Sequence, residues 1–356
     1  MMAMEPFYRL ELAVLLLIYY SLVSVVIAEP VDEKVISNQT RNEEISLLFK
    51  QYVIRHNKTY LNDPNEYYKR QEIFKQSLAR QFKLNQRGKE LNGSAVYGVN
   101  KFSDWTLQEF KEFLRMGYRK PSQIIAMNTN SECLAEAPNL QLPPHWDWKI
   151  SGKVTAVKNQ GKCGSCWAFT AVENIESQWA IKHGTLKELS VQELISCGAG
   201  SGCSGGNTCN ALKWLKDHDY TVAPESEFPY QDKETTCIDK AKHSKEGVRI
   251  SEYCCYETAN ETNFMQPIVA FIGPMAVNVD ATLWHDYLGG IIQYHCTDTD
   301  INHAVQITGY DETGEVPYWI VRNSWGADFG DKGYLYIKIG KNLCGLAGDP
   351  SYVTVP

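Results

Sequence analysis

The chain lacks an excess of positive charge, a metal-binding sequence pattern and internal repeats. Its 356 residues include 35 lysines and arginines against 42 aspartates and glutamates, which gives a formal net charge of −7. This balance gives no electrostatic reason to expect nucleic acid as the main partner. No His-Glu-x-x-His spacing occurs, and the histidines other than His303 lack a motif partner. We therefore expect no metal site and no cofactor.

Long apolar runs are also scarce, because only residues 12–28 form one. This run is short for a membrane-spanning helix, which needs about 20 apolar residues. It ends in Val26-Ile27-Ala28, a small-residue cleavage pattern. We therefore expect residues 1–28 to be a signal peptide, whose removal leaves a chain without membrane contact. A retained signal-anchor is the alternative, since acidic residues accompany the basic one in the leading segment.

Cysteine is missing from the first 132 residues, and all eleven cysteines follow. Such a number agrees with an oxidising compartment. Glycosylation triplets support the same secretory route. They begin at four asparagines: Asn38, Asn57, Asn92 and Asn260.

The rest of the chain divides into three compositional zones. Residues 29–120 are rich in lysine, glutamate, glutamine and asparagine, and apolar side chains recur at helical spacing in 43–55 and 66–85. Taken alone, this zone predicts a helical hairpin without a special role. Residues 121–141 form a polar linker. The third zone begins at residue 142 and contains ten of the cysteines and most tryptophans.

The third zone predicts helices first and strands later. Helices are expected at 166–183, from Ser190 onward, where Ser190-x-x-Glu193 is expected to form a capping box, and at about 209–217. Short β-rich runs bounded by glycine and proline follow at three places: 275–281, 318–322 and 334–339. This order predicts an α+β fold of two packed halves, about 142–250 helical and about 251–350 stranded. A cleft between such halves is a usual place for a substrate.

The strongest chemical signal is the segment Gln160-Gly161-Lys162-Cys163-Gly164-Ser165-Cys166-Trp167, which opens the first of these helices. A thiol is a good nucleophile only as the thiolate, and the unpaired N–H groups of a helix N-terminus stabilise that anion. A nearby imidazolium would stabilise it further. The alternative for an arbitrary secreted cysteine is that Cys166 is half of a disulfide.

The string Cys-Gly-Ser-Cys-Trp favours the nucleophile, because it is the signature of papain and the cathepsins, with His and Asn about 130–150 residues downstream. His303 lies inside that window in Asn302-His303-Ala304-Val305, and Asn323 lies slightly beyond it in Asn323-Ser324-Trp325-Gly326. The chain therefore resembles the papain-like cysteine proteases. The resemblance implies a two-lobed fold, with a helical left lobe, a β-barrel-like right lobe and the active-site cleft between them.

The resemblance also implies a role for each of these residues. Cys166 would attack the scissile carbonyl and form an acyl-enzyme, while His303 would be its cationic partner and protonate the leaving amine. Asn323 would orient the imidazole, with Trp325 shielding that hydrogen bond. Gln160 and the Cys166 backbone N–H would stabilise the oxyanion.

The N-terminal zone resembles the propeptides of this family. Gly98-Val99-Asn100-Lys101-Phe102-Ser103-Asp104 reproduces the pattern GxNxFxD, carried by Gly98, Asn100, Phe102 and Asp104. Four residues fit the helical ERFNIN spacing: Glu66, Arg70, Phe74 and Asn85. Ser77 and Gln81 depart from it, at positions where Asn and Ile are expected. The resemblance implies that residues 29–141 are an inhibitory propeptide that runs through the cleft, and that residues 142–356 are the catalytic domain, starting near Leu142-Pro143.

Family pairings carried over by position imply three disulfides, with Cys166 free: Cys163–Cys203, Cys197–Cys237 and Cys296–Cys344. Cys209 could pair with Cys254 or Cys255, and the sequence does not choose between them. Cys133 lies just before the expected cleavage point. We expect it to be discarded with the propeptide, and the alternative is that it tethers a retained fragment.

Matching positions also imply a specificity pocket, lined by Asn207, Thr208, Asn278, Ala304 and Asp349, with Gly205 and Gly206 binding the substrate backbone. Asn278 and Asp349 stand where many relatives carry apolar or small residues. A buried, paired carboxylate favours a cation, so our hypothesis is a pocket that accepts polar or basic P2 side chains. The alternative is that Asp349 turns toward solvent.

Together these features predict the zymogen of a monomeric endopeptidase that degrades proteins and peptides in lysosomes or outside the cell. Its expected partners are these substrates, its own propeptide and cystatin-like inhibitors. Three alternatives stay open: a catalytically inactive secreted scaffold, an inhibitor, and an aminopeptidase if a Cys133 fragment remains attached. The presence of all four catalytic residues and a whole catalytic domain weighs against the first two.

Overall fold

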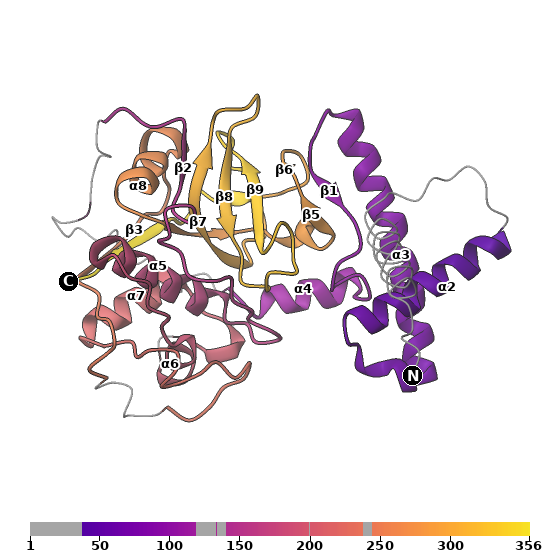
Figure 1. Ribbon diagram of the computed structural model, residues 1–356, viewed down its shortest axis with the longest axis horizontal. Helices are drawn as coiled ribbons and strands as arrows, with labels where there is room; N and C mark the ends of the chain where they lie inside the picture. The colour runs from indigo at the N-terminus through magenta and orange to yellow at the C-terminus, as the bar shows by residue number, and fades with distance from the viewer. Residues whose placement is uncertain (1–37, 119–132, 134–139, 199, 238–243) are drawn as a thin grey trace, which may run out of the picture.

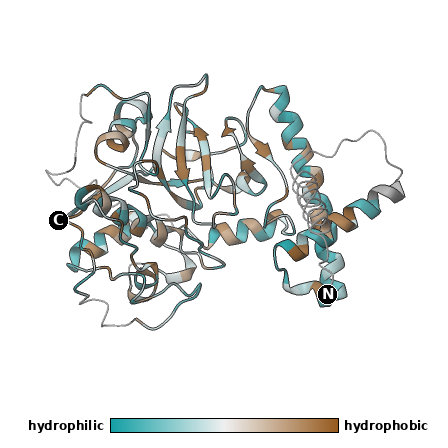
Figure 2. Ribbon diagram, viewed as in Figure 1, coloured by the Kyte–Doolittle hydropathy of each residue, from teal (hydrophilic) through white to brown (hydrophobic). Residues whose placement is uncertain are grey.

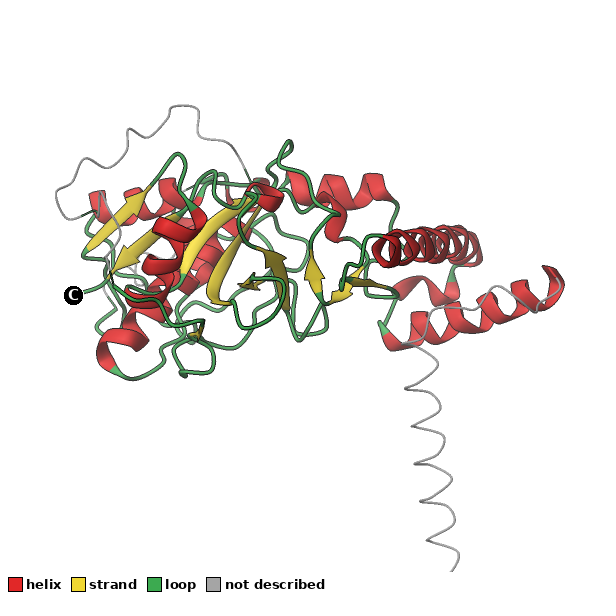
Figure 3. Ribbon diagram, turned by 90° about the horizontal axis from the view of Figure 1, so that it is seen from above, coloured by secondary structure: helices red, strands yellow, loops and turns green. Residues whose placement is uncertain are grey.

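The computed structural model describes residues 38–118, 133, 140–198, 200–237 and 244–356 (Figure 1). The expected signal peptide, residues 1–28, lies outside the described residues. Figure 3 shows a helical N-terminal part at one end of the molecule and the mixed helical and stranded part beside it. Within the described residues, no helix combines the length and the apolar character that crossing a membrane requires.

The N-terminal part contains two long helices, α2 (Asn38–Arg55) and α3 (Pro64–Glu90), followed by strand β1 (Val96–Tyr97) and helix α4 (Leu107–Arg115). Both predicted helices are confirmed, and α3 starts where the Asp63 side chain accepts from two backbone N–H groups. Much of α3 is hydrophilic (Figure 2), and its buried Phe74 packs against Phe49, Tyr52 and Val53 of α2. These helices therefore share only a small core of their own.

The helical lobe is built around α5 (Cys166–His183), which is buried almost throughout and has the predicted bounds. Helices α6 (Val191–Cys197) and α7 (Thr208–Asp217) pack beside it. Ser190 caps α6 by accepting from the Glu193 backbone N–H. The Glu193 carboxylate does not complete the capping box, because it accepts from the Tyr220 hydroxyl and the Ala223 N–H instead.

The second lobe is an eight-stranded sheet with strand order β3-β10-β4-β7-β8-β9-β6, and β2 also pairs with β7. The strands are β2 (His145–Asp147), β3 (Glu252–Cys255), β4 (Met275–Val279), β6 (Ile291–Ile292), β7 (His303–Asp311), β8 (Tyr318–Arg322), β9 (Tyr334–Lys338) and β10 (Ser351–Thr354). The predicted strands are present. The one expected at 275–281 ends at Val279, because the next backbone N–H donates to the Cys344 carbonyl. Strand β5 (Tyr287–Gly289) pairs with β1, and helix α8 (Gln266–Phe271) packs on the sheet.

Each half of the catalytic part contains a terminal segment that packs with the other half. Strand β2, near the start of this part, pairs with β7 of the sheet. In the other direction, side chains of β3 and β10 pack into the core of the helical lobe, among them Tyr253 and Val353. A division near residue 250 therefore does not hold at either end of the domain.

Five disulfides link the described cysteines. Three are the pairs expected from the resemblance, Cys163–Cys203, Cys197–Cys237 and Cys296–Cys344, and Cys209 pairs with Cys255. The expectation that Cys133 leaves with the propeptide is not met, because Cys133 is bonded to Cys254 of β3. Its sulfur lies against this strand, 3.5 Å from the Tyr253 carbonyl oxygen.

Of the four expected glycosylation sites, Asn57, Asn92 and Asn260 are exposed on the surface. Asn57 and Asn92 adopt positive φ angles of 48° and 54°, a conformation that asparagine tolerates better than most residues. Asn38 begins α2, and its side chain lies outside the described residues.

Candidate active site

Cys166 is the first residue of α5 and is fully buried. The backbone N–H groups of Cys166, Trp167 and Ala304 lie near its sulfur and act to lower the pKa of the thiol, against the larger effect of burial. The first two belong to the helix N-terminus, where such groups favour an anion. The third belongs to the residue after His303, so the thiol of the helical lobe meets the start of β7 in the other lobe.

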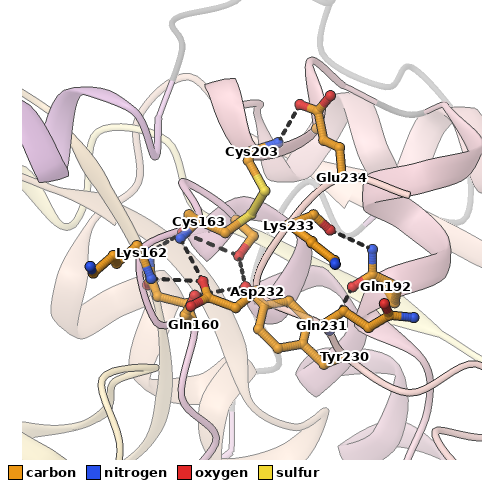
Figure 4. Close-up of a disulfide and its surroundings, with 12 residues drawn as sticks. Gln160, Lys162, Cys163, Gln192, Cys203, Tyr230, Gln231, Asp232, Lys233 and Glu234 are labelled. Carbon is orange, nitrogen blue, oxygen red and sulfur yellow. Dashed lines mark hydrogen bonds between the residues drawn. A yellow bond between two sulfur atoms is a disulfide. The ribbon is translucent and has the colours of Figure 1, made fainter. Parts of the chain in front are cut away.

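The loop before Cys166 is held from several sides (Figure 4). The Cys163–Cys203 disulfide links this loop to the segment around Cys203. The Asp232 carboxylate accepts from the backbone N–H groups of Lys162 and Cys163 at 2.7 and 2.9 Å. A Cβ at Gly164 would lie 2.0 Å from the Met116 carbonyl oxygen. A larger residue at Gly164 would therefore collide with the backbone of the N-terminal part.

His303 is the first residue of β7 and lies opposite Val279 of β4. Its Nε2 is 2.8 Å from the Asn323 Oδ1, and its ring stacks on Trp325 with centroids 4.7 Å apart. Because an amide oxygen only accepts, the neutral imidazole carries its proton on Nε2. Nδ1 is therefore the nitrogen with a free lone pair.

The Gln160 side chain is buried and held at both ends. Its Oε1 accepts from the Ser324 hydroxyl at 2.7 Å, and its Nε2 donates to the Cys163 carbonyl oxygen at 3.0 Å. The amide nitrogen therefore faces the loop that leads to Cys166. An N–H group on this side can act together with the backbone N–H groups at the start of α5.

The N-terminal part covers the thiol directly. After α4 the chain passes over Cys166, and a Cβ at Gly117 would lie only 2.7 Å from the sulfur. The Gly117 carbonyl oxygen accepts from the Gly206 N–H at 3.4 Å, and Tyr118 forms a single β-bridge with Gly206. Figure 1 shows α4 between the N-terminal helices and the two lobes. Gly117 and Tyr118 thus occupy the space above the Cys166 sulfur.

This cover changes the protonation of the pair. Burial raises the pKa of the Cys166 thiol to about 12 and lowers the pKa of His303 to about 4. Removing water disfavours the charged form of each group. Both are therefore neutral in the covered structure, and a thiolate–imidazolium pair is disfavoured while the N-terminal part is in place.

A cavity of about 600 Å³ lies at Tyr118 and is lined by two of the expected specificity residues, Asn278 and Asp349. Tyr118, Asn278 and Asp349 line it, and further carboxylates stand around it: Glu257, Asp298 and Asp300. The Asp349 Oδ2 accepts from the Asn278 side chain at 2.7 Å and from the Asn207 and Tyr118 side chains at 3.4 Å. Burial raises the pKa of Asp349 to about 6.

The other residues expected to bind substrate do not line this cavity. Thr208 donates its hydroxyl to the Trp167 carbonyl oxygen at 3.4 Å, and Ala304 is fully buried beside the thiol. Gly205 has a φ of 101°, and a Cβ at Gly206 would lie 2.5 Å from the Trp167 ring. Glycine is therefore required at both positions for the backbone to run here.

The residues of the propeptide-like motifs form two polar clusters. In the first, Asp104 accepts from Tyr52, Lys58 and Tyr60 at 2.6 to 2.8 Å. Arg70 bridges Glu66 and Glu109 beside it. Four motif residues support the backbone around these contacts: Phe74 in the core of α2 and α3, Asn85 bonded to Tyr97, Gly98 against Leu288, and Phe102 against Trp325.

The second cluster joins α3 to the catalytic part, and the sequence did not point to it. Arg80 bonds to the Asp286 carboxylate, with Nε 2.5 Å from Oδ2, and its Nη2 lies 2.9 Å from His285 Nδ1. Ser77 and Gln81 bond to Arg80 and Asp286 respectively, and the Asn100 side chain donates to the His285 carbonyl oxygen. The two departures from the ERFNIN pattern thus lie at this contact, which is the signal that could have revealed it.

Comparisons with known proteins agree with this architecture. The family described as "Papain family cysteine protease" matches residues 142–354, and the "Cathepsin propeptide inhibitor domain" matches residues 49–110. Human cathepsin O is 42% identical over 285 residues, which are 79% of this chain and 87% of that protein. A viral cathepsin of Heliothis zea nuclear polyhedrosis virus is 37% identical, over 86% of this chain and 84% of its own length.

Solved precursor structures are similar over the same range. Digestive procathepsin L 3 of Tenebrio molitor has a TM-score of 0.73 at 30% identity, covering 87% of this chain and 99% of its own. The recombinant stem bromelain precursor has a TM-score of 0.76 at 30% identity, with the same coverage. The similarity to cathepsin O agrees with two segments that favour this subgroup, residues 284–293 and 317–326. The chain therefore belongs to the papain family of cysteine proteases, as a peptidase precursor that carries its own cathepsin-type inhibitory propeptide.

Proposed function

We propose that this precursor yields an endopeptidase in which Cys166 is the nucleophile and His303 its acid–base partner. The observation that supports this most strongly is the position of the thiol, which lies at the N-terminus of α5 and near the backbone N–H of Ala304, the residue after His303. The imidazole is held through Nε2 by Asn323, so that Nδ1 remains for the thiol. This is the arrangement that nucleophilic catalysis by a Cys–His pair requires.

The reaction then follows from the geometry. His303 takes the thiol proton on Nδ1, and the thiolate attacks the scissile carbonyl to form a tetrahedral oxyanion. The Cys166 backbone N–H and the Gln160 side chain would donate to this oxygen. The imidazolium protonates the leaving amine, and water, deprotonated by His303, hydrolyses the acyl-enzyme. Asn323 and Trp325 keep the ring aligned through both steps.

Mass spectrometry of the acidified precursor tests this function. A cysteine-directed epoxide inhibitor should add once to a fragment that begins near Leu142, and peptide mapping should place the adduct on Cys166. The unacidified precursor should react much more slowly, because Gly117 covers the sulfur and burial keeps the thiol neutral. If the chain stays unlabelled after an added protease has removed the propeptide, the scaffold alternative replaces the enzyme.

We extend the proposal to the P2 preference. The Asp349 carboxylate lines the cavity and accepts from three side chains, one of which belongs to the propeptide. Once Tyr118 leaves, a cationic substrate side chain could take its place beside the carboxylate. Asn207 and Asn278 would remain and hold the charge in position.

Asp349→Ala should therefore lower the preference for Arg over Leu at P2, measured as the ratio of kcat/KM values, by about tenfold or more. Asp349→Asn, which keeps the size of the side chain, should have the same effect. Because only the ionised carboxylate attracts a cation, the wild-type preference for Arg should fall as the pH is lowered and Asp349 becomes protonated. A peptide library that shows only Leu, Val or Phe at P2, unchanged in Asp349→Ala, would disprove this assignment.

The cellular setting belongs to the same proposal. Three features support a glycosylated protein of the secretory route: the apolar N-terminal residues, the disulfides, and the exposed asparagines Asn57, Asn92 and Asn260. We propose that the mature enzyme acts as a monomer in lysosomes or outside the cell, where cystatin-like proteins would inhibit it. It would begin near Leu142.

A further inference from the structure

We propose that cleavage near Leu142 does not by itself release the propeptide, because the Cys133–Cys254 disulfide keeps it covalently on the catalytic domain. The inference rests on the proposed function only for the position of the cut. Cys133 lies before that cut, and Cys254 belongs to β3 of the catalytic domain. A chain cut between them remains a single covalent molecule until the bond or a second peptide link is broken.

The environment of the bond favours its persistence. Cys254 is 2% exposed and belongs to the hydrophobic core of the sheet, and β3 is paired with β10 along its length. The sulfurs are therefore shielded on the side of the catalytic domain from attack by thiols. Of the cysteines the structure describes, only Cys166 is free, so no described neighbouring thiol exchanges with this bond.

The position of the bond along the chain gives it a consequence for inhibition. Tyr118, which lies in the cavity beside Asp349, is 15 residues before Cys133. After one cut the inhibitory segment is still joined to the domain through this short connection. Tethered ligands of this kind rebind at effective concentrations of about millimolar. Full activity therefore requires a second cut, between Tyr118 and Cys133, or reduction of the disulfide by a thiol, which yields two thiols and an oxidised reductant.

A second cut leaves a different product. The mature protein would then consist of two chains, the catalytic domain and a short peptide that contains Cys133, joined through Cys254. The intact mass of this protein, measured without reductant, would exceed the mass of the catalytic chain alone by the mass of the peptide that contains Cys133. Reducing agents, which are used to protect a catalytic thiol, would remove the peptide and conceal it.

The experiment uses a full-length Cys166→Ala precursor, so that its result does not depend on whether the chain is an active enzyme. A recognition sequence for a site-specific protease replaces residues 134–139, between Cys133 and Leu142, because a glutamate-specific enzyme that cut after Glu136 would also cut after Glu132, before Cys133. Under denaturing conditions without reductant, the products of this cut should stay together and gain the mass of one water. With dithiothreitol they should separate. Separation without reductant would overturn the proposal.

Two controls keep the result interpretable. The additional change Cys133→Ser should let the cut products separate without reductant, while the remaining disulfides are unaffected. If that variant does not fold, the disulfide-linked peptide pair can be mapped in the parent protein, and its absence also overturns the proposal. In the precursor with Cys166 intact, adding dithiothreitol after the single cut should raise activity at least about tenfold, and clearly more than in Cys133→Ser. An equal response in both would show that the tether does not inhibit.

Discussion

A Cys166→Ala precursor should remain at full length on acidification, and its catalytic domain, freed by another protease, should hydrolyse peptides at least about 10⁴-fold more slowly than the wild type. The reason is that the proposed covalent step has no other nucleophile in the site. Gln160 and the N-terminus of α5 would still stabilise an oxyanion, so a small residual rate over water is expected.

His303→Ala should cause a loss of similar size, because the thiol then has no group that accepts its proton and none that protonates the leaving amine. The double variant should be scarcely slower than either single variant, since the two residues act as one unit. The measurement is kcat/KM on a fluorogenic peptide, after the domain has been freed in trans.

The control for these variants is the affinity of the separately produced propeptide. Both substitutions lie away from the Arg80 cluster, so tight propeptide binding would show that the variant domains are folded. If Cys166→Ala kept more than about 1% of wild-type activity while binding the propeptide normally, another residue would have to be the nucleophile.

Acidification from pH 7 to pH 4.5 should weaken the binding of the propeptide to the catalytic domain by about 10²-fold through His285 alone. The hydrogen bonds of this residue fix its protonation state. Nε2 lies 2.9 Å from the Phe102 carbonyl oxygen, which only accepts, and Nδ1 lies 2.9 Å from the Arg80 guanidinium, which only donates. The bound ring is therefore neutral, and a second proton would face the guanidinium.

The direction of the effect follows from the two states. Burial, followed by the charge of Arg80, lowers the pKa of His285 to about 4 in the complex, although Asp286 opposes this. When the propeptide leaves, both causes are removed and the pKa returns toward its ordinary value of 6.5. The free domain therefore binds the proton more strongly than the complex does. Affinity should be fully present above about pH 6.5 and fall by about tenfold per pH unit below it.

All charged groups around the ring bear on this prediction. Arg80 comes from α3, Asp286 follows His285, Asp104 lies farther off in the propeptide, and the Phe110 ring of α4 stacks on the imidazole at 4.5 Å. Carboxylates in the interface also take up protons in acid, so part of the pH dependence belongs to them. A variant at His285 is needed to separate the two contributions.

The measurement is the inhibition constant of the isolated propeptide against the mature domain between pH 7 and 4.5. His285→Gln should bind the propeptide at pH 7 and lose about two powers of ten from the pH dependence, because its amide does not titrate. Arg80→Gln should weaken binding at pH 7 and also flatten the curve. If the wild type and His285→Gln gave parallel curves, His285 would have no part in acid release.

The sequence predicted the elements that depend on local pattern. The bounds of α5 and β8 match their predicted ranges, because a buried helix and a short β-rich run each carry their own periodicity. The positions of Cys166, His303, Asn323 and Gln160 could be chosen because each stands in a short string of fixed spacing. The structure then brings them together from both lobes.

Contacts between distant segments could not be predicted in this way. Arg80 and Asp286 are about 200 residues apart, and neither stands in a pattern that indicates a partner. His285 gave no signal for the same reason, and Ser77 and Gln81 looked only like departures from a motif. The pairing of Cys133 with Cys254 was also beyond the sequence, since four cysteines without assigned partners permit several connectivities.

The two residues above the Cys166 sulfur show what kind of ligand fits there. Gly117 brings a bare backbone against the thiol and accepts from Gly206, and Tyr118 points a phenol at Asp349. A medicinal chemist could copy this pair as a short peptide scaffold, with a reactive group placed where the glycine faces the sulfur. Selectivity among related enzymes would come from the phenol, because its hydroxyl donates a hydrogen bond to a carboxylate that an apolar pocket lacks.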